Sequence, residues 1–165
     1  MSIIARKSLE LASLCSSGEL GFHAGYKAID PLLEETDKPS PRNISRYIFP
    51  VIASGALVLA TRIPVTASGR LYNALGPLSG LTYPAVKNYG LEQQQLPKNK
   101  YREIADGTAS GTFAGLIDCA VRRCGHPLMP LRSIPPRFIP HTVGGGIAGG
   151  ALVLGSLLVD KWAQK

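Results

Sequence analysis

A run of twenty-two residues without a charged side chain, Phe138 to Val159, constrains the fold of this chain more than any other feature. A hydrocarbon core about 30 Å thick is crossed by about 20 residues of α-helix. Seven of the eight residues from 144 to 151 are Gly or Ala, and each Gly inside a helix costs about 1 kcal/mol relative to Ala in water. Lipid offers the backbone no other hydrogen-bond partners, so a helix forms there despite its glycines. The run therefore predicts a membrane helix over residues 139–160.

Two other interpretations of this run remain open. Its GGGIAGG segment has the composition of a phosphate-binding loop that precedes a helix, and the whole run could also be a buried helix of a soluble protein. The sequence contains no G-x-x-x-x-G-K-[ST] motif, and no acidic ribose partner follows the glycines before the chain ends at Lys165. The length and the flanks of the run favour the membrane helix.

Glycines recur at intervals of four in two apolar runs, and this spacing brings small residues onto one face of a helix. Such rows let a second helix backbone approach closely, either from the same chain or from a neighbour. They predict helix-packing faces formed by Gly107, Gly111, Gly115, Gly145, Gly146, Gly149 and Gly150.

The remaining apolar runs predict further membrane helices. Tyr47–Thr61 carries no charge and predicts a helix near 47–63, and the glycine row predicts one near 105–122. Residues 71–86 are also uncharged, but Gly and Pro interrupt them, so they predict a doubtful, broken or interfacial segment. The segments LEQQQLPKNKYRE and HPLMPLRSIPPRFIP are predicted to be connectors. The fold class that follows is all-α, a small membrane protein with about three transmembrane helices.

The first 46 residues differ from the rest of the chain. They contain six basic and six acidic side chains, whereas residues 47–165 contain twelve basic and five acidic ones and so carry the whole net charge of +7. Apolar residues fall on one helical face near the start, which predicts an amphipathic arm followed by a polar linker. This segment resembles a mitochondrial targeting helix only in part, because such helices avoid acidic residues and Glu10 and Glu19 are present. We expect an arm over 1–46 and a membrane domain over 47–165.

The positive charge bears on possible partners. Basic residues occur in pairs and triplets between apolar runs, as in loops that face anionic lipid. A nucleic-acid interface would need a basic patch with interleaved aromatic residues or a known module, and the sequence contains neither. The expected partners are therefore other membrane subunits and lipids, including anionic lipids, and not nucleic acid.

No pattern in the sequence indicates catalysis. Neither G-x-S-x-G nor H-E-x-x-H occurs, and Cys119, Cys124 and His126 form a poorly spaced set for zinc. We expect reduced thiols, no cofactor, no metal and no enzyme activity. Asp118 is the one acid in the run Gly107–Val121. Its carboxylate either reaches the membrane–water interface beside Arg122 or is an intramembrane charge. An intramembrane charge would be paired inside the bundle or would lie on a translocation path.

The glycine rows in GTASGTFAG and GGGIAGG resemble a superfamily of small mitochondrial inner-membrane proteins. It contains the protein-import channel subunits and a four-helix accessory subunit of respiratory complex I, and GTFAGLIDCAVRRCGHPL is similar to the second helix and following loop of the latter. The import members carry an Arg followed four positions later by an Asp between their glycine elements, and no such pair lies between the two glycine rows here. The resemblance covers about the last sixty residues and implies a bundle without active-site chemistry. We therefore expect a non-catalytic accessory subunit of a mitochondrial inner-membrane respiratory assembly, with a transport or translocation component as the alternative.

Overall fold

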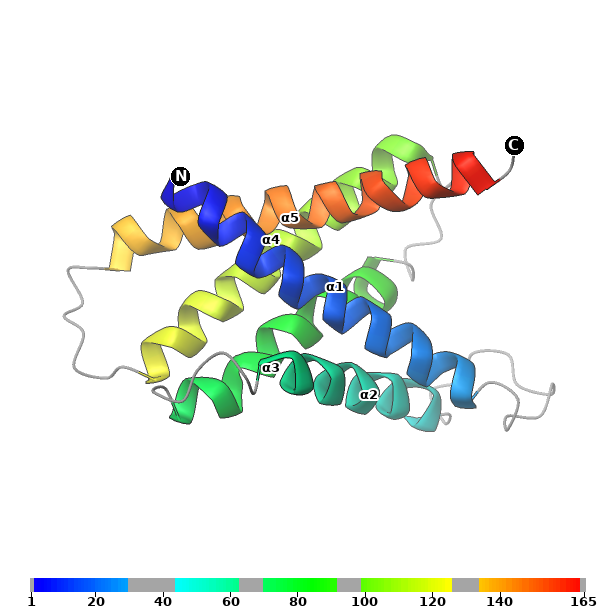
Figure 1. Ribbon diagram of the computed structural model, residues 1–165, viewed down its shortest axis with the longest axis horizontal. Coiled ribbons are helices and arrows are strands. Elements are labelled where there is room, and N and C mark those ends of the chain that lie inside the picture. Colours follow the sequence, from blue (N-terminus) through cyan, green and yellow to red (C-terminus); the bar gives the residue numbers. More distant parts are fainter. Residues whose placement is uncertain (1, 30–43, 63–69, 92–98, 126–133, 164–165) are drawn as a thin grey trace.

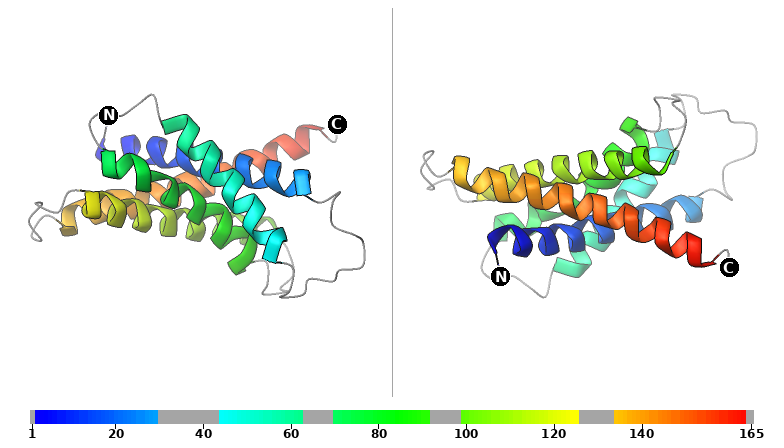
Figure 2. Two further views of the ribbon diagram at one scale, coloured as in Figure 1. Left: turned by 90° about the horizontal axis from the view of Figure 1, so that it is seen from below. Right: turned by 90° about the horizontal axis from the view of Figure 1, so that it is seen from above.

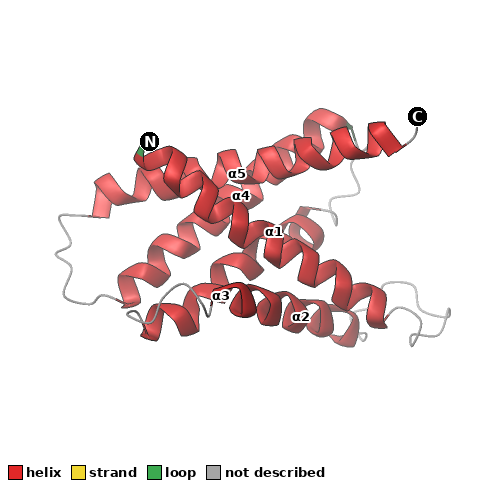
Figure 3. Ribbon diagram, viewed as in Figure 1, coloured by secondary structure: helices red, strands yellow, loops and turns green. Residues whose placement is uncertain are grey.

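The computed structural model describes residues 2–29, 44–62, 70–91, 99–125 and 134–163, and within these ranges it contains helices and no strand (Figure 3). The all-α prediction is confirmed for this part of the chain. The elements are α1 (Ile3–Ile29), α2 (Ile44–Arg62), α3 (Arg70–Ala85), the π-helical turn η2 (Val86–Leu91), α4 (Lys100–Gly125) and α5 (Ile134–Ala163).

The five α-helices form one bundle in which α4 and α5 are antiparallel neighbours (Figures 1 and 2). α1, the helix of the predicted N-terminal arm, runs diagonally across the bundle and contacts α2, α3 and α5. α3 in turn contacts α2 and α4. The surface on which the predicted arm rests is therefore formed by helices of the same chain.

The buried apolar core is small and lies where α1 crosses the other helices. One cluster joins Leu11 and Leu14 of α1 to Val58 of α2 and Ala148 of α5. A second joins Cys15 of α1, Tyr83 of α3 and Ala114 of α4. Because few large side chains separate the helices, their backbones approach one another closely along most of their contacts.

α4 and α5 begin inside the two segments that the sequence predicts to be connectors. α4 starts at Lys100 because Asn99 caps it, its Oδ1 accepting a hydrogen bond from the Arg102 N–H at 2.8 Å. α5 starts at Ile134, so that Pro135 and Pro136 occupy its first turn, where the missing N–H groups would have had no partner anyway. The expectation that both connectors end at the apolar runs was wrong, because polar residues and prolines are compatible with a first helical turn.

The doubtful segment 71–86 is helical in the structure, as α3 continued by η2. The expectation that its glycines and prolines break it was wrong. Pro84 has no N–H to donate to the carbonyl of Gly80, four residues earlier. The chain passes this point by widening into the π-helical turn that starts at Val86. α1 approaches that same carbonyl, since a Cβ on Gly18 would collide with Gly80 O.

Among the described residues, one helix is long and apolar enough to cross a membrane, Phe138–Ala163 of α5. The apolar part of α2, Ile48–Ala60, is shorter. In α4 the uncharged stretch lies between Asp106 and Asp118, and its eleven residues extend about 16 Å, roughly half of a hydrocarbon core. Three complete spans therefore remain a prediction, while one candidate membrane helix is present.

Candidate functional site

The tightest contact in the bundle is between the backbones of α4 and α5 at their glycines. A Cβ on Gly111 would lie 2.9 Å from the Cα of Gly149 and would collide with the carbonyl oxygen of Gly145. The contact recurs one turn away on either side, at Gly107 with Gly149 and at Gly115 with the backbone of His141. Real Cβ atoms do not approach other atoms this closely, so larger residues at these positions would force the helices apart.

The two remaining predicted glycines face threonine side chains of α4. A Cβ on Gly146 would lie 2.8 Å from Oγ1 of Thr112, and one on Gly150 would lie 2.7 Å from Oγ1 of Thr108. Both threonine hydroxyls donate hydrogen bonds to carbonyl oxygens one turn earlier in α4. The structure thus places all seven predicted packing glycines at one interface, within the chain.

Sequence reasoning missed a third glycine row, on α1. A Cβ on Gly21 would lie 2.6 Å from the Cα of Ser54, and one on Gly25 would lie 2.8 Å from the Cα of Pro50, both on α2. The Ser54 hydroxyl donates a hydrogen bond of 2.7 Å to the Gly18 carbonyl, which ties α2 to α1. The spacing of Gly18, Gly21 and Gly25 places them on one helical face, and this was the available signal.

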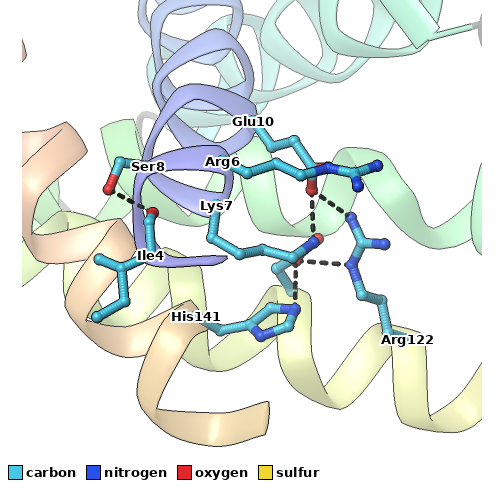
Figure 4. A network of polar contacts seen from close by, with 8 residues as sticks. Ile4, Arg6, Lys7, Ser8, Glu10, Arg122 and His141 are labelled. Carbon is cyan, nitrogen blue, oxygen red and sulfur yellow. Dashed lines mark hydrogen bonds and ion pairs between the residues drawn. The ribbon is translucent and has the colours of Figure 1, made fainter. Parts of the chain in front are cut away.

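A buried cluster of charges joins α1, α4 and α5 near one end of the α4–α5 interface (Figure 4). The Asp118 side chain is 1% exposed, and its Oδ2 accepts a hydrogen bond of 2.9 Å from Nε of Arg122. His141 Nε2 lies 3.3 Å from the same oxygen. Arg122 also reaches across to α1, where its guanidinium donates to Oε2 of Glu10 at 3.1 Å. Lys7 donates to the same Glu10 oxygen at 2.5 Å.

The structure places Asp118 beside Arg122 and inside the bundle, and its depth in a membrane stays a prediction. Asp118 is paired inside the bundle, with an arginine one turn later in its own helix and a histidine from α5. Removing two opposite charges from water together is far less costly than removing one alone. The arrangement can hold three helices in register, with Arg122 and His141 both at Oδ2 of Asp118.

A second polar cluster links α1 to the π-helical turn. Lys87 Nζ lies 2.6 Å from Oε1 of Glu19, and His23 Nε2 lies 3.2 Å from the same oxygen. The Lys87 ammonium also lies 5.8 Å from the ring centroid of Tyr83, whose hydroxyl donates to the Gly149 carbonyl at 3.4 Å. The wider turn of η2 thus directs Lys87 towards α1, and Tyr83 connects α3 to the glycine interface.

The cysteines offer no sign of a metal centre or of a nucleophile in the described part of the chain. No group of three His, Cys, Asp or Glu side chains there could hold a metal ion. Burial raises the pKa of the Cys15 thiol to about 12, helped by the negative charges of Glu19 and Asp118. The thiol therefore stays protonated and unreactive. The side chains of the weak zinc set at Cys124 and His126 lie outside the described residues.

The polarity of the bundle is inverted relative to that of a water-soluble helix bundle. Four serines are buried, at Ser17, Ser54, Ser79 and Ser110. Large apolar side chains are instead exposed on each α-helix, most of them on α2 and α5, whereas the described part of α3 contributes only Leu78. On α2 and α5 the exposed ones are Ile48, Phe49, Ile52, Leu57, Leu59, Phe138, Ile139, Val143, Ile147, Leu154, Leu158, Val159 and Trp162.

Comparison of the chain with protein-family models, with curated proteins and with solved structures finds no match.

Proposed function

We propose that this protein is a non-catalytic helical subunit embedded in a membrane, whose role is to pack against other membrane helices and lipid. The observation that carries the proposal is the inverted polarity: glycines and serines lie between the helices, and large apolar residues point outwards. Water drives large apolar side chains to the inside of a bundle. Lipid provides no such drive, and small residues then fill helix interfaces because they allow close backbone contact.

The glycine rows contact each other within the chain, so partners are expected to bind elsewhere on the surface. Gly111 and Gly149 contact each other, so these rows are occupied by the chain itself. Other subunits would contact the outer apolar faces, including that of α2 at Ile48 and Ile52 and that of α5 at Leu154 and Leu158. We infer a subunit that folds first through its own glycines and then joins an assembly through larger side chains.

The finer proposal is an accessory subunit of a respiratory assembly in the mitochondrial inner membrane. Its support is the resemblance of GGGIAGG to the superfamily that contains an accessory subunit of complex I, and of GTFAGLIDCAVRRCGHPL to that subunit. A transport or translocation component is the second candidate, favoured by one observation, the carboxylate of Asp118 inside the bundle. The pairing of Asp118 with Arg122 and His141 supports the structural role more strongly, since a conducting path needs groups that exchange partners.

Two measurements test membrane insertion. Alkaline carbonate should leave the chain in the membrane pellet, because the apolar faces have no favourable place in water. Trp162, the one tryptophan, ends α5 and is 80% exposed, so brominated phosphatidylcholine should quench its fluorescence as expected for a ring at the bilayer interface. Release by carbonate together with no quenching would overturn the proposal.

Two further measurements separate the assembly role from transport. Native gel electrophoresis of membranes in mild detergent should show the chain migrating with a respiratory complex at constant stoichiometry. Reconstituted protein that conducts ions, with conduction lost on Asp118→Asn, would support transport instead. Migration of the chain alone, without conduction, would contradict both.

A further inference from the structure

The two ends of the bundle differ in charge. α1, α3 and α5 begin at the end where α2 and α4 finish, and we name it the basic end (Figures 1 and 2). The helix halves nearest to it contain two acidic residues, Glu10 and Asp118, both bound by Arg122. They contain seven basic residues, Arg6, Lys7, Arg62, Arg70, Arg122, Arg123 and Arg137.

The opposite end is close to neutral. Its helix halves contain six basic residues, Lys27, Arg46, Lys87, Lys100, Arg102 and Lys161, and four acidic ones, Glu19, Glu103, Asp106 and Asp160.

Six of the seven basic residues at the basic end are arginines, and the guanidinium fork matches the oxygens of a phosphate group. Among the basic side chains that the structure describes at this end, that of Arg6 is 78% exposed. The apolar surface of α5 starts at this same end, with Phe138 and Ile139 exposed directly after Arg137. A cationic rim beside an exposed apolar face matches the boundary between lipid headgroups and acyl chains.

We propose that the basic end binds the phosphate groups of anionic lipids and fixes the orientation of the bundle in the bilayer. This inference rests on the proposed membrane function and adds to it a ligand class and a location. Each basic side chain near an anionic surface changes binding about fivefold. The opposite end, where acids offset the basic residues, should contribute little.

The test is the binding of a fluorescent phosphatidylglycerol to the full chain in neutral detergent. The triple variant Arg6→Gln, Arg62→Gln, Arg137→Gln should raise Kd at least tenfold. The matched triple variant at the other end, Lys27→Gln, Arg46→Gln, Lys161→Gln, removes the same charge and should change Kd less than twofold. Circular dichroism should show equal helix content in all three proteins, and Arg137→Gln alone is the fallback if the first triple variant misfolds.

Each alternative outcome has a defined meaning. Equal loss of binding in both triple variants would overturn the proposal, because net charge and not the basic end would then be responsible. Displacement of the lipid by millimolar inorganic phosphate would also overturn it, in favour of a soluble anion. If carbonate leaves the protein in the membrane while the triple variants bind alike, this inference fails and the membrane function stands. Release of the protein by carbonate would contradict the proposed membrane function, on which this inference rests.

Discussion

Gly111 of α4 and Gly149 of α5 are in mutual backbone contact, since a Cβ added to either would lie 2.9 Å from the Cα of the other. The relationship is symmetric, so neither helix can compensate for a larger residue on its partner by moving a side chain. Two short stretches of small residues thus define the closest approach in the bundle, and the other helices are arranged around this antiparallel pair.

Substitution of Gly111 tests this contact directly. Gly111→Ala should destabilise the bundle by about 1–3 kcal/mol, because the added methyl group meets backbone atoms that have no room to move. Gly155→Ala is the matched control, since a Cβ there meets nothing within 4 Å, and it should stabilise α5 by up to about 1 kcal/mol. Thermal unfolding in detergent, followed by circular dichroism, measures both effects. A lower Tm for Gly155→Ala than for Gly111→Ala would contradict the assigned interface.

Retention in the native assembly gives a related comparison. Gly111→Leu and Gly149→Leu should separate α4 from α5 and lower the amount of chain that migrates with its complex. Ala151→Leu should lower it less, because it leaves the α4–α5 contact intact and only adds bulk to the outer face of α5, which also carries Leu154 and Leu158. Quantitative native gels measure this difference. Equal retention of the three variants would show that the α4–α5 contact does not matter for assembly.

Asp118→Asn tests the buried charge cluster. The variant removes the Asp118 charge from Arg122, which keeps its contact with Glu10, and it removes the charge that faces His141. We expect a loss of stability of about 3 kcal/mol, at the lower end of the effect of breaking a buried pair, because Arg122 keeps one partner. Arg6→Gln is the control, since Arg6 is 78% exposed and its 3.5 Å pair with Glu10 should contribute less than about 1 kcal/mol. Equal unfolding midpoints for these variants would argue that the cluster contributes nothing.

Acid should weaken the link between α1 and α4. Burial acts to raise the pKa of Glu10, but the hydrogen bond and charge of Lys7 and the charge of Arg122 outweigh it and lower the pKa below its ordinary value of 4.5. A lowered pKa means that the folded state favours the carboxylate, so this stabilisation is present above pH 4.5 and is lost as the pH falls below it. Glu10→Gln should therefore unfold more easily than wild type at neutral pH, and the difference should shrink in acid. A difference that is constant from pH 7 to pH 3 would contradict this assignment.

The Cys15 thiol should be inert in the folded protein. In a variant with Cys119→Ser and Cys124→Ser, a maleimide at neutral pH should label Cys15 only after denaturation in sodium dodecyl sulfate. The physical reasons are its 0% exposure and the raised pKa, which leaves almost no thiolate. Rapid labelling of the native protein, checked by mass spectrometry, would mean that α1 is not packed where the structure places it.

Much of the fold follows from local patterns in the sequence. Uncharged runs predicted helices near 47–63, 105–122 and 139–160, and the structure has helices at Ile44–Arg62, Lys100–Gly125 and Ile134–Ala163. The ends were less predictable, because Asn99 caps α4 and because prolines are tolerated at the start of α5. α3 was missed as a continuous helix, since its glycines and prolines disfavour one locally while its contacts with α1, α2 and α4 support it.

The sequence by itself determined that this chain forms helices, that seven of its glycines lie on packing faces, and that its positive charge accompanies its apolar segments. Each of these properties depends on the spacing of residues within one segment. Only the tertiary structure decided that the two glycine rows meet each other, that Asp118 is shared between Arg122 and His141, and that basic residues from all five helices gather at one end. Those relationships join residues far apart in sequence, and they depend on how helices cross, which no local pattern specifies.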